Sequence, residues 1–310
     1  MAEYQTWTVS EPYLNIHCAL GEGPVYEAAT NTLRFIDIKK HRIHTVDLNV
    51  GPLSVKTFQL DTPIGVTIDI EGVDPAKKFL IGVKTGLAIF DRETGKYELI
   101  KRYHESQEND VRLRSNDGAV DPQGRLWIGT MNDFNVGSFH PEGHLFRFDS
   151  DLSGHIMREN LKIPNGLGWS ADQKTMYFTH STERRVIAFD YDAKTGNISN
   201  ERTFYSHEGS GEPDGFRMDE EGNIWHAIYG EGRVVKISPE GKAIGEIKYP
   251  TKAITCPVFV GTELWVTTAA ESDDNEVESM KNGGAIFKVD VGVKGVKEFK
   301  FKLNADVKSL

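Results

Sequence analysis

The sequence has few cysteines, no long apolar run and no leader-like start, and each absence excludes a class of protein. Its two cysteines, Cys18 and Cys256, could form at most one disulfide bond and lack the spacing of a zinc site. We expect both thiols to be reduced. No stretch approaches the roughly 18 apolar residues of a membrane span, and the first residues lack the regions of a secretion signal. We therefore expect a cytoplasmic protein that does not enter a membrane.

Basic blocks are absent as well. The chain carries 46 acidic against 36 basic residues, a formal net charge of -10, and no cluster of Lys and Arg that could offset it. The mean field of such a protein repels a polyanion, so nucleic acid is not an expected partner. Hydrophobic residues make up 38% of the chain, which is enough for a packed core and argues against disorder.

Helical periodicity is also missing from most of the chain. The best candidates for a helix, residues 103–114 and 274–281, are too polar to bury one face. Instead, 30 glycines and 12 prolines separate short runs rich in Val, Ile, Phe, Tyr, Trp and Thr. This is the pattern of strands and turns, so the chain is predicted to be all-β.

The strand pattern repeats six times. An apolar segment recurs every 40 to 50 residues, and the six segments begin at Leu33, Phe79, Leu126, Met176, Ile224 and Leu264. A second strand and a turn follow each one. A period of about 45 residues with about four strands is typical of a propeller blade. We predict a single six-bladed β-propeller over residues 1–310, with blades at about 20–60, 61–110, 111–160, 161–207, 208–250 and 251–303.

Two β-sandwiches of three units each are the alternative all-β architecture. No linker rich in Pro or Ser and no change in composition divides the chain near its middle, which disfavours that arrangement. The signatures of WD repeats are absent, so a scaffolding propeller of that kind is disfavoured too.

Oxygen-bearing side chains recur at one phase of the repeat. Glu22, Asn165 and Asp214 each precede a glycine and stand 10 or 11 residues before the recurring segment, and Asn116 has this position in the third blade. Because the innermost strands of a propeller surround its axis, these positions are expected to converge at one face. A single Asn-Gly or Asp-Gly is typical of a plain turn, so it is the shared phase that indicates a site.

Two carboxylates and an amide oxygen in an apolar setting would be costly unless a cation lay between them. We therefore predict that Glu22, Asn165 and Asp214 bind one divalent metal ion. Oxygen ligands favour Ca²⁺, Mg²⁺ or Mn²⁺, with Ca²⁺ the first choice and Zn²⁺ or Fe²⁺ as alternatives. His140 and His144 could form another pair of metal ligands. A proline and a glycine between them are incompatible with a regular helix that would place both on one face, so we interpret both as loop residues.

Loops that follow the second strand of each blade should return to the same face and form the rim of the site. They are long at residues 131–142 and 271–283, and the fifth blade offers residues 229–231. Long loops on a rigid face commonly select the substrate. Arg114, two residues before Asn116, could reach the same cavity and bind a carboxylate or the hydroxyl groups of a polar substrate.

Several of these motifs resemble the senescence marker protein, gluconolactonase and luciferin-regenerating enzyme family, the regucalcin-like proteins. The resemblance covers nearly the whole chain and rests on Gly21-Glu-Gly-Pro-Val-Tyr, Arg114-Ser-Asn-Asp-Gly, Pro164-Asn-Gly-Leu-Gly-Trp-Ser, Phe189-Asp-Tyr-Asp and Glu212-Pro-Asp-Gly. It implies a six-bladed propeller, metal ligands at Glu22, Asn165 and Asp214, substrate contacts at Arg114 and Asn116, and metal-dependent hydrolysis of a sugar lactone. Where mammalian members carry an acidic pair, this chain has Asn132, Asp133 and Phe134, which suggests an aromatic wall.

These observations favour a divalent-metal-dependent lactonase that acts on a small polar lactone. We expect Asp214 to act as the base for the attacking water, with attack by metal-bound hydroxide as the alternative. We expect Asn132 and Tyr229 to shape selectivity. A metal-dependent aryl-esterase or phosphotriesterase propeller is one alternative, and a non-catalytic calcium-binding regulatory propeller is another. A G-x-S-x-G serine nucleophile is absent. We expect a monomer or a weak homo-oligomer.

Overall fold

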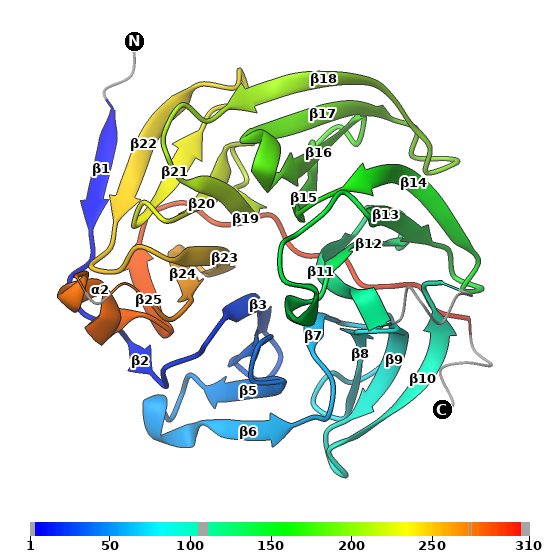
Figure 1. Ribbon diagram of the computed structural model, residues 1–310, viewed down its shortest axis with the longest axis horizontal. Coiled ribbons are helices and arrows are strands. Elements are labelled where there is room, and N and C mark those ends of the chain that lie inside the picture. Colours follow the sequence, from blue (N-terminus) through cyan, green and yellow to red (C-terminus); the bar gives the residue numbers. More distant parts are fainter. Residues whose placement is uncertain (1–3, 105–110, 272, 274, 305–310) are drawn as a thin grey trace.

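Six β-sheets surround a central axis in a computed structural model of the protein (Figure 1). The structure describes residues 4–104, 111–271, 273 and 275–304. In the first four blades the strands follow one another along the chain and pair in antiparallel fashion, with the first strand nearest the axis. The predicted all-β class and six-bladed propeller are confirmed.

The first four blades each consist of four consecutive strands. Blade one contains β3 (Gly21–Glu27), β4 (Thr32–Asp37), β5 (Arg42–Asp47) and β6 (Lys56–Gln59). Blade two contains β7 (Ile64–Ile68), β8 (Lys78–Val83), β9 (Gly86–Asp91) and β10 (Lys96–Arg102). Blade three contains β11 (Leu113–Val120), β12 (Leu126–Asn132), β13 (Gly143–Phe148) and β14 (Gly154–Leu161). Blade four contains β15 (Pro164–Trp169), β16 (Thr175–His180), β17 (Arg185–Tyr191) and β18 (Ile198–Ser206).

The last two blades recruit strands from the N-terminal region. Blade five contains β19 (Glu212–Met218), β20 (Ile224–Tyr229), β21 (Arg233–Ile237) and β22 (Ala243–Lys248), and β1 (Gln5–Thr8) lies parallel to its outer edge. Blade six contains β23 (Ile254–Val260), β24 (Glu263–Thr268) and β25 (Ala285–Asp290), and β2 (Leu14–Asn15) completes it. Our predicted blades began near residue 20 and left these N-terminal strands out. They cover sheet edges that would otherwise be unpaired.

In the described residues helical structure is confined to short connections. Among them are η1 (Pro52–Ser54), η2 (Phe134–Val136), η3 (Ser181–Glu183) and α2 (Val277–Asn282). The helix α2 overlaps the polar candidate at 274–281 and ends one residue beyond it. Residues 105–110 of the other candidate lie outside the described part. No helix among the described residues is long and apolar enough to cross a membrane.

The apolar core lies between neighbouring blades. Ile36 and Ile43 of blade one pack with Phe79 and Phe90 of blade two, and all four side chains are fully buried. Burying a side chain of this size contributes roughly 1.5 to 3 kcal/mol. Because each blade packs against the next in this way, the inner strands are held rigidly around the axis.

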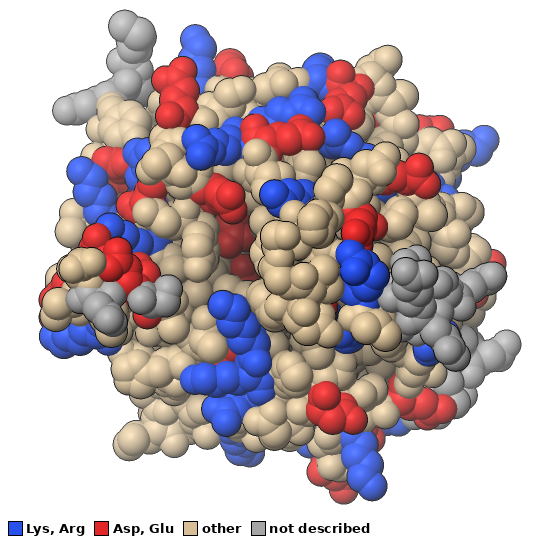
Figure 2. Space-filling view, viewed as in Figure 1, with Lys and Arg blue, Asp and Glu red and all other residues tan. Residues whose placement is uncertain are grey.

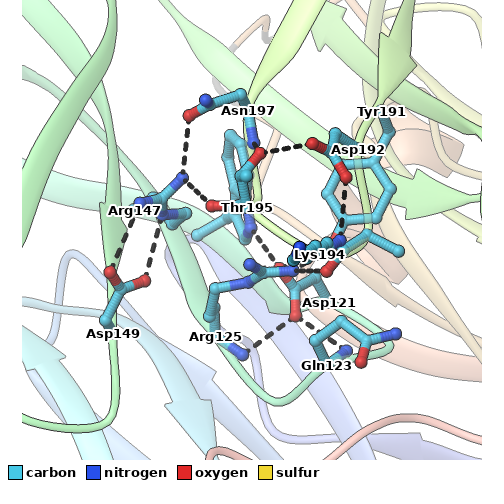
Figure 3. A network of polar contacts seen from close by, with 12 residues as sticks. Asp121, Gln123, Arg125, Arg147, Asp149, Tyr191, Asp192, Lys194, Thr195 and Asn197 are labelled. Atoms are coloured by element: carbon cyan, nitrogen blue, oxygen red, sulfur yellow. Dashed lines mark hydrogen bonds and ion pairs between the residues drawn. The ribbon is translucent and has the colours of Figure 1, made fainter.

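A polar network joins blade three to blade four (Figure 3). Asp121, fully buried in the turn between β11 and β12, accepts hydrogen bonds from Arg125 Nε at 2.7 Å, Trp127 Nε1 at 3.1 Å and Tyr191 Oη at 2.7 Å. Its other oxygen accepts the backbone N–H groups of Gln123 and Arg125 at 2.9 Å. Both oxygens of this buried carboxylate therefore have partners.

Residues 291–304 form a C-terminal strap, coloured red in Figure 1, that crosses behind the inner strands. The Val296 N–H donates to the Met218 carbonyl of blade five, and the Phe301 N–H to the Asp69 carbonyl of blade two, both at 2.9 Å. Our prediction extended the sixth blade to residue 303. The strap instead spans the axis and closes the propeller on the face away from the viewer.

Candidate functional site

Every innermost strand has a break in its pairing register near the axis. The six breaks lie between Glu22 and Val25, Ile64 and Val66, Ser115 and Gly118, Pro164 and Leu167, Pro213 and Phe216, and Ile254 and Pro257. A β-bulge takes residues out of the regular ladder and turns their side chains in a new direction. Glu22, Asn116, Asn165 and Asp214 all lie at or within these bulges, so the shared phase of the sequence corresponds to a shared backbone irregularity.

Neighbouring bulges approach each other closely. A Cβ atom added to Gly65 would lie 2.4 Å from the Asn116 carbonyl oxygen, and one added to Gly166 would lie 3.1 Å from the Asp214 carbonyl oxygen. Side chains could not be accommodated at the first position without moving the backbone. Glycine beside the candidate residues is thus what allows the blades to meet here.

A chain of hydrogen bonds connects three of the predicted site residues. Arg114 Nη1 donates to Asn116 Oδ1 at 2.9 Å, and Asn116 Nδ2 donates to Asn165 Oδ1 at 3.0 Å. Asn165 Nδ2 in turn donates to Ser181 Oγ at 2.8 Å. These bonds fix the orientation of the Asn165 amide, whose oxygen retains a second lone pair for another partner.

The carboxylates near the axis have few partners although they are buried. Glu22, Asp117 and Asp214 are only 8 to 9% exposed. Glu22 Oε2 accepts the Gly23 N–H at 3.0 Å, and Asp117 Oδ1 accepts the Gly118 N–H at 2.7 Å. Asp117 Oδ2 has no hydrogen-bond partner within the described part of the chain. These carboxylates therefore keep unused acceptor capacity.

Electrostatic repulsion among these groups is substantial. Burial and the charge of Asp117 raise the pKa of Glu22 to about 8. Burial and the charges of Glu22 and Asp117 hold the pKa of Asp214 well above its ordinary value, and Arg114 offsets only part of this. Burial also lowers the pKa of Arg114 to about 10 despite the nearby carboxylates. The excess negative charge favours a bound cation.

The donor chemistry fits a hard divalent ion. Glu22, Asn165 and Asp214 offer two carboxylates and one amide oxygen, which are the ligand types that Ca²⁺ and Mg²⁺ accept. The described residues contain no cluster of three or more His, Cys, Asp and Glu side chains that could hold a metal ion. The candidate set differs from such a cluster because its third donor is an asparagine.

Arg114 is held between several groups but keeps one donor available. Its guanidinium carbon lies 4.4 Å from the centre of the Phe134 ring, and Nη2 contacts Met131 Sδ at 3.3 Å. Its Nε has no hydrogen-bond partner among the residues described. Phe134, the residue expected to form an aromatic wall, thus stacks on the predicted substrate-binding arginine.

The loop of residues 131–142 carries the next predicted contact. Asn132 is fully buried, with Nδ2 donating to Glu142 Oε2 at 2.9 Å and Oδ1 accepting the His140 N–H at 2.6 Å. Its polar atoms hold the loop together in this structure. A direct contact between Asn132 and substrate stays a prediction.

Tyr229 lies at the end of β20 and is 37% exposed. Burial of part of the side chain and the charge of Asp214 raise its pKa, so its hydroxyl group lies within electrostatic reach of Asp214. Figure 2 shows acidic side chains inside a hollow near the centre of this face and a basic patch beside it. A role for Tyr229 in the wall of the site stays a prediction.

Two residues near the site were missed by the sequence reasoning. Asp117 was noted within its motif but not selected, although it follows Asn116 directly and could have been found from the same phase. His226 is fully buried, and its Nε2 lies 3.1 Å from both the Asp214 carbonyl oxygen and Thr179 Oγ1. Burial lowers the pKa of His226 to about 3, so the neutral ring supports the backbone of Asp214.

The chain was compared with models of known protein families. Residues 20–270 match the model of the SMP-30/gluconolactonase/LRE-like region. The matched segment begins just before Glu22 and includes every residue of the candidate site.

Individual relatives cover almost the whole chain. Regucalcin of Xenopus laevis is 34% identical over 93% of this chain and 95% of its own length. Pentonolactonase XacC of Haloferax volcanii is 34% identical over 91% of this chain and 94% of its own. A solved structure of the calcium-binding protein regucalcin from Agrobacterium tumefaciens has a TM-score of 0.84 at 28% identity, with 97% of this chain and 99% of that chain covered.

Proposed function

This chain belongs to the SMP-30/gluconolactonase/LRE-like family, and on that basis we propose that it is a lactonase that opens a small polar sugar lactone, with one divalent metal ion, to the free acid. A pentonolactonase at 34% identity supports the reaction class. The observation that carries the proposal is the group of under-satisfied, buried carboxylates beside Arg114 at the axis.

Glu22, Asn165 and Asp214 would hold the metal ion, with Ca²⁺ as the first choice. A bound divalent ion would polarise the lactone carbonyl and offset the negative charge that develops on its oxygen. The hydrogen bond from Asn116 to Asn165 orients the amide ligand, and the His226 contact supports the backbone of Asp214.

Asp214 is the proposed proton acceptor for water. The water oxygen bonds to the carbonyl carbon as its proton passes to the Asp214 carboxylate, and collapse of the tetrahedral intermediate breaks the bond to the ring oxygen. The ring oxygen then takes up that proton, which yields a hydroxy acid. Burial raises the pKa of Asp214 in the protein without metal, and a bound cation would act in the opposite direction by favouring the charged carboxylate.

Arg114 is the proposed anchor for the polyhydroxy part of the substrate. Its unpaired Nε donor can bind a hydroxyl oxygen, while Asn116 and Phe134 hold the guanidinium group in place. A polar anchor of this kind favours a sugar lactone over the apolar esters expected of an aryl-esterase.

A calcium-binding regulatory propeller is the second candidate. It is favoured by the similar solved structure that is described as a calcium-binding protein. The same oxygen donors would serve either role, so catalysis has to be measured directly.

Hydrolysis of a panel of five- and six-membered aldonolactones tests the proposal. Acid release is followed with a pH indicator, with EDTA-treated protein, with added Ca²⁺, Mg²⁺, Mn²⁺ or Zn²⁺, and against spontaneous hydrolysis. We expect metal-dependent acid release from at least one lactone. Turnover of aryl esters alone would support the aryl-esterase alternative, and tight Ca²⁺ binding by calorimetry without turnover of any lactone would support the regulatory one.

A further inference from the structure

A cavity lies on the propeller axis, and residues of all six innermost strands line it. Its volume is about 500 Å³, and it is enclosed by the inner strands and by strap residues 294–300. Its walls are mainly apolar, with Val66, Ile68, Leu167, Met218, Val258 and Phe259 among them. A cavity of this size and character is typical of a site for a small organic molecule. Asp117 lines it, whereas Glu22, Asn165, Asp214 and Arg114 do not.

The C-terminal strap forms the outer wall of this cavity. Between its backbone anchors at Val296 and Phe301, the strap is tied to the blades by side chains. Glu298 pairs with Arg217, and Lys300 Nζ lies 3.7 Å from Asp69 Oδ2. The strap thus covers the cavity through contacts at its two ends and two ion pairs in between.

A buried donor in the cavity wall has no partner. Trp127, Trp225 and Trp265 each donate from Nε1 to a carboxylate at 2.8 to 3.1 Å. Trp169 also lines the cavity and is 93% buried, yet its Nε1 has no hydrogen-bond partner in the described ranges. A buried N–H group without an acceptor costs free energy, which a ligand carrying an acceptor would recover.

The charges near the cavity are balanced among themselves. Arg217 is bonded to Glu298 through Nε and to the Phe216 carbonyl at 2.9 Å, and the charge of Asp117 also acts on it. The cavity wall therefore offers apolar surface, the donor of Trp169 and the unpaired Asp117 Oδ2, and the charge of Arg217 acts on the Asp117 carboxylate. These features select an uncharged ligand.

We propose that this cavity binds an uncharged, mainly apolar small molecule through a carbonyl-type acceptor placed on Trp169 Nε1. The site shares Asp117 with the surroundings of the candidate active site but includes none of the proposed metal ligands or Arg114, and it does not depend on the proposed function. It lies at the end of the axis that the strap covers, where Val296 and Phe299 are 41% and 39% exposed.

The proposal is tested with prodan, an uncharged naphthalene ketone whose emission shifts to the blue in apolar surroundings. Titration of the full chain is expected to give saturable binding to one site. Ala119→Phe adds a ring inside the cavity and should weaken binding at least tenfold. Trp169→Phe keeps the ring shape but removes the donor, and should weaken binding several-fold.

Matched controls separate cavity binding from adsorption to the surface. Ala243→Phe adds the same ring on the exposed outer strand β22 and should bind prodan like the unchanged chain. Asp214→Asn should also leave prodan binding unchanged, since Asp214 does not line the cavity. If Ala119→Phe fails to fold, as judged by circular dichroism, Val296→Trp fills the cavity from the strap and has the same expected effect.

Three outcomes would overturn the proposal. They are no saturable prodan binding by the unchanged chain, equal binding by the cavity-filled variant and the unchanged chain, and full affinity in Trp169→Phe. The last result would remove the acceptor contact on which the ligand class rests.

Discussion

Asp121 and Asp214 are both buried carboxylates, but their surroundings are opposite. Asp121 accepts five hydrogen bonds from backbone, arginine, tryptophan and tyrosine donors, and the bond from Tyr191 joins blade three to blade four (Figure 3). Asp214 has no donor to its carboxylate within the described residues and faces the charges of Glu22 and Asp117. Burial alone therefore says little about the role of an acidic residue.

The two carboxylates differ in the source of the partners that offset their loss of hydration. A carboxylate whose partners are all supplied by the protein stabilises the fold, because its desolvation is repaid within the structure. A buried carboxylate with unused acceptors among like charges destabilises the protein when no ligand is bound. Binding of a cation or another external partner removes that cost. Substitutions at the two sites should therefore change stability and turnover in opposite ways.

The largest expected effect is the loss of turnover in Asp214→Asn. Removing the proposed base and metal ligand should lower kcat/KM for lactone hydrolysis at least a thousandfold, which corresponds to about 4 kcal/mol. The metal-free variant should be at least as stable as the metal-free parent because one of the repelling charges is gone. Turnover is measured by acid release and stability by thermal unfolding in EDTA. A variant that retains turnover within tenfold contradicts the assignment.

The next largest effect is the loss of stability in Asp121→Asn. The amide nitrogen would meet donors of Arg125, Trp127 or Tyr191, and the ion pair to Arg125 would be lost. Breaking a buried pair of this kind costs about 3 kcal/mol. Urea unfolding should show this decrease, while kcat/KM at 25 °C stays within twofold of the parent. A loss of turnover without a loss of stability would contradict the purely structural role of Asp121.

The metal-free protein should show a pH dependence that comes from Glu22. The folded-state pKa of about 8 lies above the unfolded value of about 4.3, so the folded state holds the extra proton between these values. Stability in EDTA should therefore fall as pH rises from about 5 to 8. Glu22→Gln should flatten this slope, as measured by thermal unfolding across the range. An unchanged slope would remove Glu22 as its source.

The smallest effect concerns Glu231, which supports the loop that carries Tyr229. Burial opposes its ionisation, but bonds from the Gly211 N–H at 2.7 Å, from His207 and from Arg233 lower the pKa of Glu231 to about 2. Its contribution is complete above about pH 4.3 and is lost as pH falls toward 2. Glu231→Gln should cost about 1 kcal/mol at pH 7. The gap between variant and parent in urea unfolding should close in acid.

The propeller could be predicted from the sequence because each blade repeats the same alternation of apolar strands and turns. The shared phase of Glu22, Asn165 and Asp214 in the repeat could also be found from the sequence, since equivalent positions in a repeat occupy equivalent positions around the axis. Arg114 was selected because it stands two residues from a position of that phase, and the structure joins its guanidinium group to Asn116 by a hydrogen bond.

Other parts of the site follow from contacts that no spacing encodes. The bulges depend on how closely neighbouring blades approach, and the support that His226 gives to Asp214 crosses from one strand to the next. Pairing with elements distant in the chain is found for the edge strands β1 and β2 and for the C-terminal strap. Their own sequences are too short or too polar to predict these partners. Pairing of this kind becomes evident only in three dimensions.

The pairing of β2 with β25 also has a consequence for how the protein is made. Blade six combines a strand from the start of the chain with three strands from near its end. During translation β2 leaves the ribosome long before its neighbours exist, so the ring stays open until the last blade has been synthesised. Contacts between such distant segments slow folding, and a circular permutant that places β2 directly after β25 should close its ring sooner.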